Sequence, residues 1–225
     1  MFWIVWKSWR LSKKGAYSGE QWIRSSLEMV KALESVGVQF EIQNMASYRE
    51  LSSACVYVGN HMSILETFVL PCLIRPHRKI TFVVKESLMQ YPFFGPILQT
   101  RNPVVVGRAN PREDLKIVLE EGQAILNKNI SIVIFPQTTR SVEFDEKKFN
   151  TLGLKLAKRA DVPVIPFALK TDAWGLGRKL KDFGKINPWK RVHICFGDAL
   201  HVSGTGKEEH RKIIEFISEK LKVWS

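Results

Sequence analysis

From residue 38 onward, short apolar runs with the composition of β-strands alternate with segments of helical period. A strand turns successive side chains to opposite faces, whereas a helix repeats about every 3.6 residues, so the two patterns can be told apart. This alternation predicts an α/β fold with a largely parallel sheet flanked by helices. The strand-like runs are residues 38–43, 54–60, 79–85, 103–107, 131–136, 162–169 and 191–197.

Several of these runs, such as "SIVIFP" and "VPVIPFAL", are almost continuously apolar, which is typical of strands covered on both faces. The clearest covering helices are predicted at residues 110–129, 148–162 and 206–223. The first has a defined start, with Asn110 as N-cap and Pro111 at the first helical position. In such sheets functional groups gather in the loops that follow the carboxyl ends of strands.

The chain before residue 37 is predicted to form N-terminal helices that precede an α/β domain of residues 37–225. Residues 2–14 combine aromatic side chains with cations, a composition typical of membrane interfaces. On a helical wheel the two sets overlap, so a core helix with inward tryptophans is the alternative. Residues 19–36 form a cleaner amphipathic helix, whose apolar face we expect to pack on the domain.

No run approaches the roughly 18 apolar residues that are needed to cross a bilayer. The apolar part of the N-terminus is too short for a signal peptide, and it precedes the charges instead of following them. We therefore expect monotopic or peripheral attachment to the cytoplasmic face of a membrane, with residues 1–36 serving both attachment and packing on the domain.

The charge balance predicts anionic partners. Lys and Arg number 34 against 22 Asp and Glu, which gives a net charge of +12. The cations are dispersed and lack the aromatic pattern of RNA-binding sheets, so an anionic membrane surface is favoured over nucleic acid. The three cysteines (Cys55, Cys72 and Cys195) are far apart, which indicates free thiols in a reducing compartment and no metal-ligand spacing.

The stretch "YVGNHMSILETFVLP" places His61 directly after a predicted strand and Glu66 five positions later. One interpretation is a catalytic pair, in which His61 takes a proton from a hydroxyl and Glu66 fixes the tautomer and stabilises the imidazolium. The other is a capping box, because Ser63 and Glu66 have the spacing S-x-x-E at a helix start. The capping box leaves His61 unexplained. Both interpretations remain open from these residues alone.

Two further loops follow predicted strands and carry groups suited to phosphate oxygens. The loop of residues 137–141 offers hydroxyls, backbone N–H groups and a guanidinium, and Arg108 lies just beyond another apolar run. Lys85 ends a third strand. An ordinary solvated loop is the alternative for each. The candidate phosphate-binding residues are Lys85, Arg108, Gln137, Thr138, Thr139 and Arg140.

Four blocks, in the same order, resemble the glycerolipid acyltransferases, the superfamily of lysophosphatidic acid acyltransferase. "NHMSILE" is similar to the His-x4-Asp block, and "FPQTTRS" to the block Phe-Pro-Glu-Gly-Thr-Arg-Ser. "VGRAN" and "VPVIPFAL" resemble the short Arg-bearing block and the Val-Pro-Val-x-Pro block, and "VVKESLMQYPFFGPIL" looks like the segment between the first two blocks. The resemblance covers residues 58–170.

The resemblance implies transfer of a fatty acyl group from acyl-CoA or acyl-carrier protein to a hydroxyl of a lysophospholipid. The acceptor that the resemblance implies is 1-acyl-glycerol-3-phosphate, which would give phosphatidic acid. His61 would be the base and Glu66 would stand in for the aspartate, while Arg108 and the Thr139–Arg140 loop would bind phosphate. The resemblance implies no metal and no cofactor beyond the acyl donor, and it implies N-terminal helices that enter one leaflet.

Three departures from the family pattern leave the acceptor open. Glu66 replaces the aspartate and has one more methylene, although the two carboxylates have similar basicity. Gln137 replaces the glutamate of its block and Thr138 the glycine, which removes a charge and a flexible backbone point. Acylation of another lysolipid, or lipid binding by a catalytically impaired protein, are therefore the alternatives.

Overall fold

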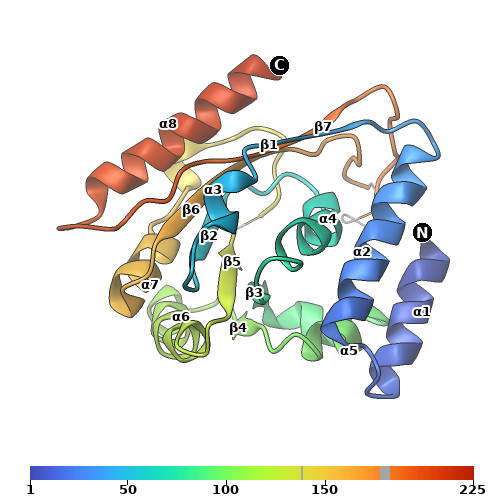
Figure 1. Ribbon diagram of the computed structural model, residues 1–225, viewed down its shortest axis with the longest axis horizontal. Coiled ribbons are helices and arrows are strands. Elements are labelled where there is room, and N and C mark those ends of the chain that lie inside the picture. Colours follow the sequence, from blue (N-terminus) through green and yellow to red (C-terminus); the bar gives the residue numbers. More distant parts are fainter. Residues whose placement is uncertain (138, 178–182) are drawn as a thin grey trace.

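The computed structural model describes residues 1–137, 139–177 and 183–225 (Figure 1). Its helices are α1 (Phe2–Lys13), α2 (Gly19–Glu34), α3 (Ala46–Arg49), α4 (Leu65–Ile74), α5 (Phe94–Gln99), α6 (Pro111–Leu126), α7 (Leu152–Ala160) and α8 (Lys207–Val223), with 3-10 turns η1 (Glu86–Gln90) and η2 (Glu146–Lys148). Its strands are β1 (Phe40–Gln43), β2 (Val56–Gly59), β3 (Ile80–Lys85), β4 (Val104–Val106), β5 (Ser131–Ile134), β6 (Val164–Lys170) and β7 (Val192–Phe196).

Within the described residues, the strands form one seven-stranded sheet in the order β1-β7-β6-β2-β5-β3-β4. The paired strands run parallel, except that β7 lies antiparallel to β6. The predicted α/β class, with a largely parallel sheet and N-terminal helices, is confirmed. Each strand-like run of the sequence corresponds to one strand, and β6 extends one residue beyond its run. The short helix α5 was not predicted, because "FGPILQ" is too short to show a period and contains both Gly and Pro.

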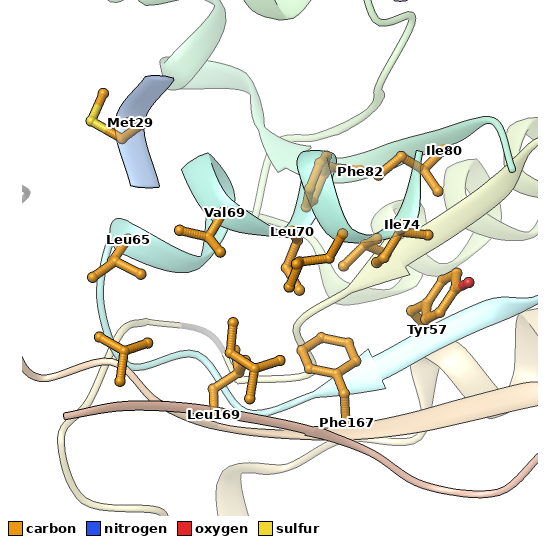
Figure 2. Close-up of a cluster of buried hydrophobic side chains, with 14 of the residues drawn as sticks. Met29, Tyr57, Leu65, Val69, Leu70, Ile74, Ile80, Phe82, Phe167 and Leu169 are labelled. Carbon is orange, nitrogen blue, oxygen red and sulfur yellow. The ribbon is translucent and has the colours of Figure 1, made fainter. Parts of the chain in front are cut away.

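Helices cover both faces of the sheet, as Figure 1 shows. On one face α2 and α4 contribute to a cluster of buried side chains, and on the other α6, α7 and α8 do so. Figure 2 shows Val69 and Leu70 of α4 above Phe167 and Leu169 of β6. At a transfer free energy of about 25 cal/mol per Å² of buried apolar surface, these two layers are the main stabilising contribution to the fold.

A serine hydroxyl fixes α2 on α4 at a break in the hydrogen bonds of α4. Pro71 lies inside α4 and has no N–H to donate. Beside it, Ser26 of α2 donates to the carbonyl of Phe68 and accepts the N–H of Cys72 at 2.9 Å. A regular helix would pair that carbonyl and that N–H directly. Because Ser26 is buried, this bridge holds α2 in a defined position over the domain.

The helix α1 packs on the domain through an aliphatic face. Ile4, Val5 and Leu11 contact the buried cluster, whereas Phe2 and Trp3 are 72 % and 65 % exposed. The alternative of a core helix with inward tryptophans therefore does not hold for Trp3. No helix in the described part of the chain is long and apolar enough to span a membrane. The division into residues 1–36 and 37–225 stays a prediction.

Candidate active site

The predicted site segments meet at the carboxyl edge of the sheet. His61 follows β2, Arg140 follows β5, Lys85 ends β3 and Arg108 follows β4. The strands β2, β5, β3 and β4 are consecutive neighbours in a parallel arrangement. Residues that are far apart in the sequence therefore come together where α/β sheets bind their ligands.

His61 and Glu66 form a hydrogen-bonded pair. Nδ1 of His61 lies 2.8 Å from Oε1 of Glu66, whose side chain is fully buried. Oε1 also accepts the backbone N–H groups of Met62 at 2.7 Å and Ser63 at 2.9 Å. Oε2 accepts the hydroxyls of Ser63 at 3.0 Å and Thr171 at 2.7 Å. The carboxylate is thus held by donors from its own loop and from the end of β6.

The geometry of residues 57–71 is compatible with the catalytic pair and reproduces part of the capping box. Glu66 accepts the backbone N–H of Ser63, as the glutamate of a capping box does. Ser63 departs from the capping-box pattern, because its hydroxyl accepts the N–H of Leu65 and not that of Glu66. A carboxylate has two oxygens with several acceptor positions, so Glu66 can close the helix start and hold His61 at the same time.

The surroundings of the pair set its protonation. Burial lowers the pKa of His61 below its usual value; Glu66 acts in the opposite direction, and the charges of Arg140 and Arg108 lower that pKa further. Burial raises the pKa of Glu66, but the hydrogen bond and the charge of His61, together with the hydrogen bonds from Thr171 and Ser63, outweigh burial and leave that pKa lowered. At neutral pH the imidazole is therefore neutral and the carboxylate ionised, which is the state that a general base requires.

The other ring nitrogen faces the loop after β5. Nε of Arg140 donates to Nε2 of His61 at 3.2 Å. The imidazole stacks on Phe135, with ring centroids 4.1 Å apart. The backbone of His61 is held from both directions, because its N–H donates to Oε1 of Gln137 at 2.7 Å and its carbonyl accepts the N–H of Ser141 at 3.0 Å.

A cavity of about 620 Å³ opens beside His61. Cations line part of it, and its remaining wall is mainly apolar and includes side chains of α1 and α2. The cationic lining residues are Lys85, Arg101, Arg108, Arg112, Arg140 and Lys155. Ile4, Trp22, Met29, Phe68 and Phe82 belong to the apolar wall. One continuous space thus offers a basic group, positive charge and an apolar surface.

The structure brings together most, but not all, of the predicted site residues. His61, Lys85, Arg108, Gln137 and Arg140 line the cavity, and Lys85 and Arg108 are exposed. Thr139 is exposed and is not among the lining residues, so its phosphate contact stays a prediction. Thr138 lies outside the described residues. No cluster of three His, Cys, Asp or Glu that could hold a metal occurs in the described part of the chain.

Sequence reasoning missed three residues that position the pair. Thr171 donates to Glu66 from the end of β6, and Phe135 stacks on His61. Asn60 joins β2 to β6, because its side chain bonds the carbonyl and the N–H of Leu169, both at 2.8 Å. All three lie at or just beyond strand ends. Functional groups gather after the carboxyl ends of strands, and Thr171 follows β6 in the same way that His61 follows β2 and Arg140 follows β5.

Comparison with known proteins identifies the family. The family model described as "Acyltransferase" matches residues 38–170, which include the His61–Glu66 pair and the Arg140 loop. The chain belongs to the acyltransferase family. A 1-acyl-sn-glycerol-3-phosphate acyltransferase from Pseudomonas aeruginosa is 27 % identical over 205 residues, which cover 91 % of this chain and 74 % of the relative. One from Haemophilus influenzae is 25 % identical over 186 residues, with coverages of 82 % and 73 %.

The fold is similar to that of a solved acyltransferase. The crystal structure of the 1-acyl-sn-glycerophosphate acyltransferase PlsC from Thermotoga maritima matches with a TM-score of 0.69 and 17 % identity, covering 99 % of this chain and 89 % of that chain. The match includes the two N-terminal helices, because it extends over nearly the whole chain. The resemblance drawn from the four sequence blocks is thus confirmed at the level of family and fold.

Proposed function

We propose that this acyltransferase moves a fatty acyl group from acyl-CoA or acyl-carrier protein to the hydroxyl of 1-acyl-glycerol-3-phosphate, giving phosphatidic acid. One observation carries the proposal: the imidazole of His61 lines the same cavity as several cations and a long apolar wall. Phosphate suits the cations, and acyl chains suit the apolar wall.

The reaction needs one base and no covalent enzyme intermediate. The acceptor oxygen attacks the thioester carbonyl carbon while Nε2 of His61 takes the hydroxyl proton. Glu66 holds Nδ1–H and stabilises the imidazolium that forms. The tetrahedral intermediate then collapses, the C–S bond breaks, and the thiolate leaves with the proton carried by His61. Arg108 and Arg140, with Lys85 at the end of β3, position the phosphate.

Gln137 supports retained catalysis over an impaired lipid-binding protein. Its Oε1 accepts the N–H of His61, a role that the glutamate of the family block could fill equally well. The amide therefore keeps the base in place although it lacks a charge.

A panel of lysolipid acceptors, assayed with acyl-CoA and with acyl-carrier protein, tests the proposal. We expect the highest kcat/KM for lysophosphatidic acid and no transfer by a folded His61→Ala variant. A preference for a lysophospholipid with a larger headgroup would support the alternative acceptor. Absence of turnover with every acceptor and both donors would contradict the enzymatic proposal.

We also propose that α1 and the loop after η1 attach the enzyme to an anionic membrane surface. Phe2 and Trp3 are exposed, and Phe93 packs edge-on against Phe2, with ring centroids 6.0 Å apart. Phe93 has φ +66°, a conformation that is unusual for a bulky residue. Exposed Arg10 and Lys13 lie on the same helix. Aromatic rings beside cations are the composition of interfacial anchors.

Vesicle pelleting tests this attachment. A deletion of residues 1–14 would also remove aliphatic core contacts, so the sharper variant is Phe2→Ser with Trp3→Ser, which changes exposed side chains. We expect weaker pelleting with anionic vesicles at both low and high salt, because apolar insertion resists salt whereas the contribution of the cations does not. Val36→Ser, which changes an exposed apolar residue just beyond the C-terminus of α2, is the matched control. Equal pelleting of the double variant and the control would place the membrane surface elsewhere.

A further inference from the structure

The lone pair that must accept the substrate proton already accepts a hydrogen bond. Glu66 receives Nδ1–H of His61, so the lone pair of the neutral imidazole lies on Nε2. Nε of Arg140 donates to that same Nε2 at 3.2 Å. An acceptor hydroxyl that donates to Nε2 must take the place of the Arg140 N–H. Arg140 is therefore both a candidate phosphate ligand and a competitor for the base.

Two hydrogen bonds tie residues on either side of Arg140 to His61, so rotation of the Arg140 side chain is enough to withdraw its guanidinium from Nε2. On one side Gln137 accepts the N–H of His61 at 2.7 Å, and on the other Ser141 donates to the carbonyl of His61 at 3.0 Å. Both anchors tie the loop after β5 to the residue that Arg140 contacts. A long, half-buried arginine side chain has several rotatable bonds with which to turn toward the cavity.

A phosphate is the partner that can compete for this guanidinium. A hydrogen bond between arginine and a phosphate oxygen is charge-assisted and is often bidentate, whereas neutral Nε2 offers one uncharged acceptor. Arg108 lines the same cavity and lowers the pKa of His61 by its charge, which places a second cation near the same point. A phosphate held there would gain from both arginines.

We propose that Arg140 is a specificity determinant of acyl transfer: it covers Nε2 of His61 until an acceptor phosphate draws its guanidinium away. The inference rests on the proposed function and deepens it. When a phosphorylated lysolipid binds, its phosphate draws the guanidinium of Arg140 away and thereby frees Nε2 of His61. A neutral lysolipid, such as a monoacylglycerol, has to break the contact between Arg140 and His61 without a compensating interaction. The enzyme thus rejects acceptors that lack phosphate even when their acyl chain fits.

Turnover of a neutral acceptor distinguishes an Arg140 that covers Nε2 of His61 from an Arg140 that only binds phosphate. We compare Arg140→Ala with the wild-type protein on lysophosphatidic acid and on monoacylglycerol. We expect kcat/KM to fall for the phosphorylated acceptor and to rise about tenfold for monoacylglycerol, the size expected for releasing one hydrogen bond of ordinary strength. If Arg140 only binds phosphate, kcat/KM for monoacylglycerol should not rise. A loss on both acceptors, or a loss on the first with no gain on the second, would overturn the proposal.

A second measurement needs no turnover and therefore remains decisive if the proposed acceptor is wrong. Diethyl pyrocarbonate acylates an unprotonated imidazole nitrogen, and peptide mass mapping distinguishes His61 from the other histidines. We expect Arg140→Ala to speed modification of His61 about tenfold, because the variant removes the hydrogen bond that occupies Nε2. Arg112→Ala removes a cation that lines the same cavity and serves as the matched control. Equal rates for Arg140→Ala and the wild-type protein would overturn the proposal.

Discussion

The two ring nitrogens of His61 hydrogen-bond to opposite charges, and their surroundings differ. On the Nδ1 side, Glu66 is fully buried and accepts donors from two separate segments of the chain. On the Nε2 side, Arg140 is half-buried at the wall of a large cavity and donates across 3.2 Å. A carboxylate buried among donors is costly to move, whereas a guanidinium beside a cavity can exchange partners. The contact of Nδ1 with Glu66 is therefore fixed, whereas the contact of Nε2 with Arg140 is exchangeable.

Glu66→Gln gives the largest expected effect. Turnover should fall on the order of 10³–10⁴, by analogy with the loss of a triad carboxylate, because the amide stabilises neither the correct tautomer nor the imidazolium. Glutamine is accepted in a capping box, so thermal unfolding should change little in comparison. A Glu66→Gln variant that is both stable and active would show that Glu66 only caps α4.

Arg140→Ala tests the exchangeable contact at Nε2 of His61. KM for the phosphorylated acceptor should rise about ten- to a hundredfold, since a hydrogen bond to a charged group contributes roughly 1.5–3 kcal/mol. KM for the acyl donor should change much less. Steady-state kinetics with each substrate varied in turn measures both values. Equal increases for donor and acceptor would assign Arg140 to the donor site or to the structure.

Thr171→Val tests whether the position of the Glu66 carboxylate depends on a donor from outside the loop that follows β2. Valine has a similar shape but cannot donate to Oε2 of Glu66, which stays buried. We expect kcat to fall about tenfold and the free energy of unfolding to fall by about 1–3 kcal/mol. Thr171→Ser keeps the hydroxyl and is the control. If valine and serine behave alike, the hydroxyl of Thr171 does not support the pair.

The smallest expected effect is on the pH profile. The acid limb of kcat/KM reports protonation of the free base, so it should lie below the ordinary histidine value of 6.5. Arg140 and Arg108 favour the neutral imidazole, so replacing either by alanine should raise the pKa of His61 and move the limb to higher pH. Glu66 favours the imidazolium, so residual activity of Glu66→Gln should show the opposite shift. A limb that moves to lower pH in Arg140→Ala would contradict the contact with His61.

Local pattern predicted the elements but not their order in space. The strand-like runs at residues 54–60 and 131–136 contain β2 and β5, because alternation and continuous apolar sequence are local properties. Nothing local indicates that β5 pairs with β2, or that β7 runs antiparallel beside β6. Those pairings depend on which faces bury one another once the helices have packed.

The sequence by itself determined the α/β class, the loops that carry the candidate site, and the proximity of His61 to Glu66, because the two are five positions apart and both lie at one helix start. Only the tertiary structure decided that Thr171 completes the carboxylate's surroundings and that Arg140 reaches Nε2. Those contacts join residues 105 and 79 positions apart. They form because β6 and β5 pair on either side of β2 and bring the residues that follow them to the same edge of the sheet.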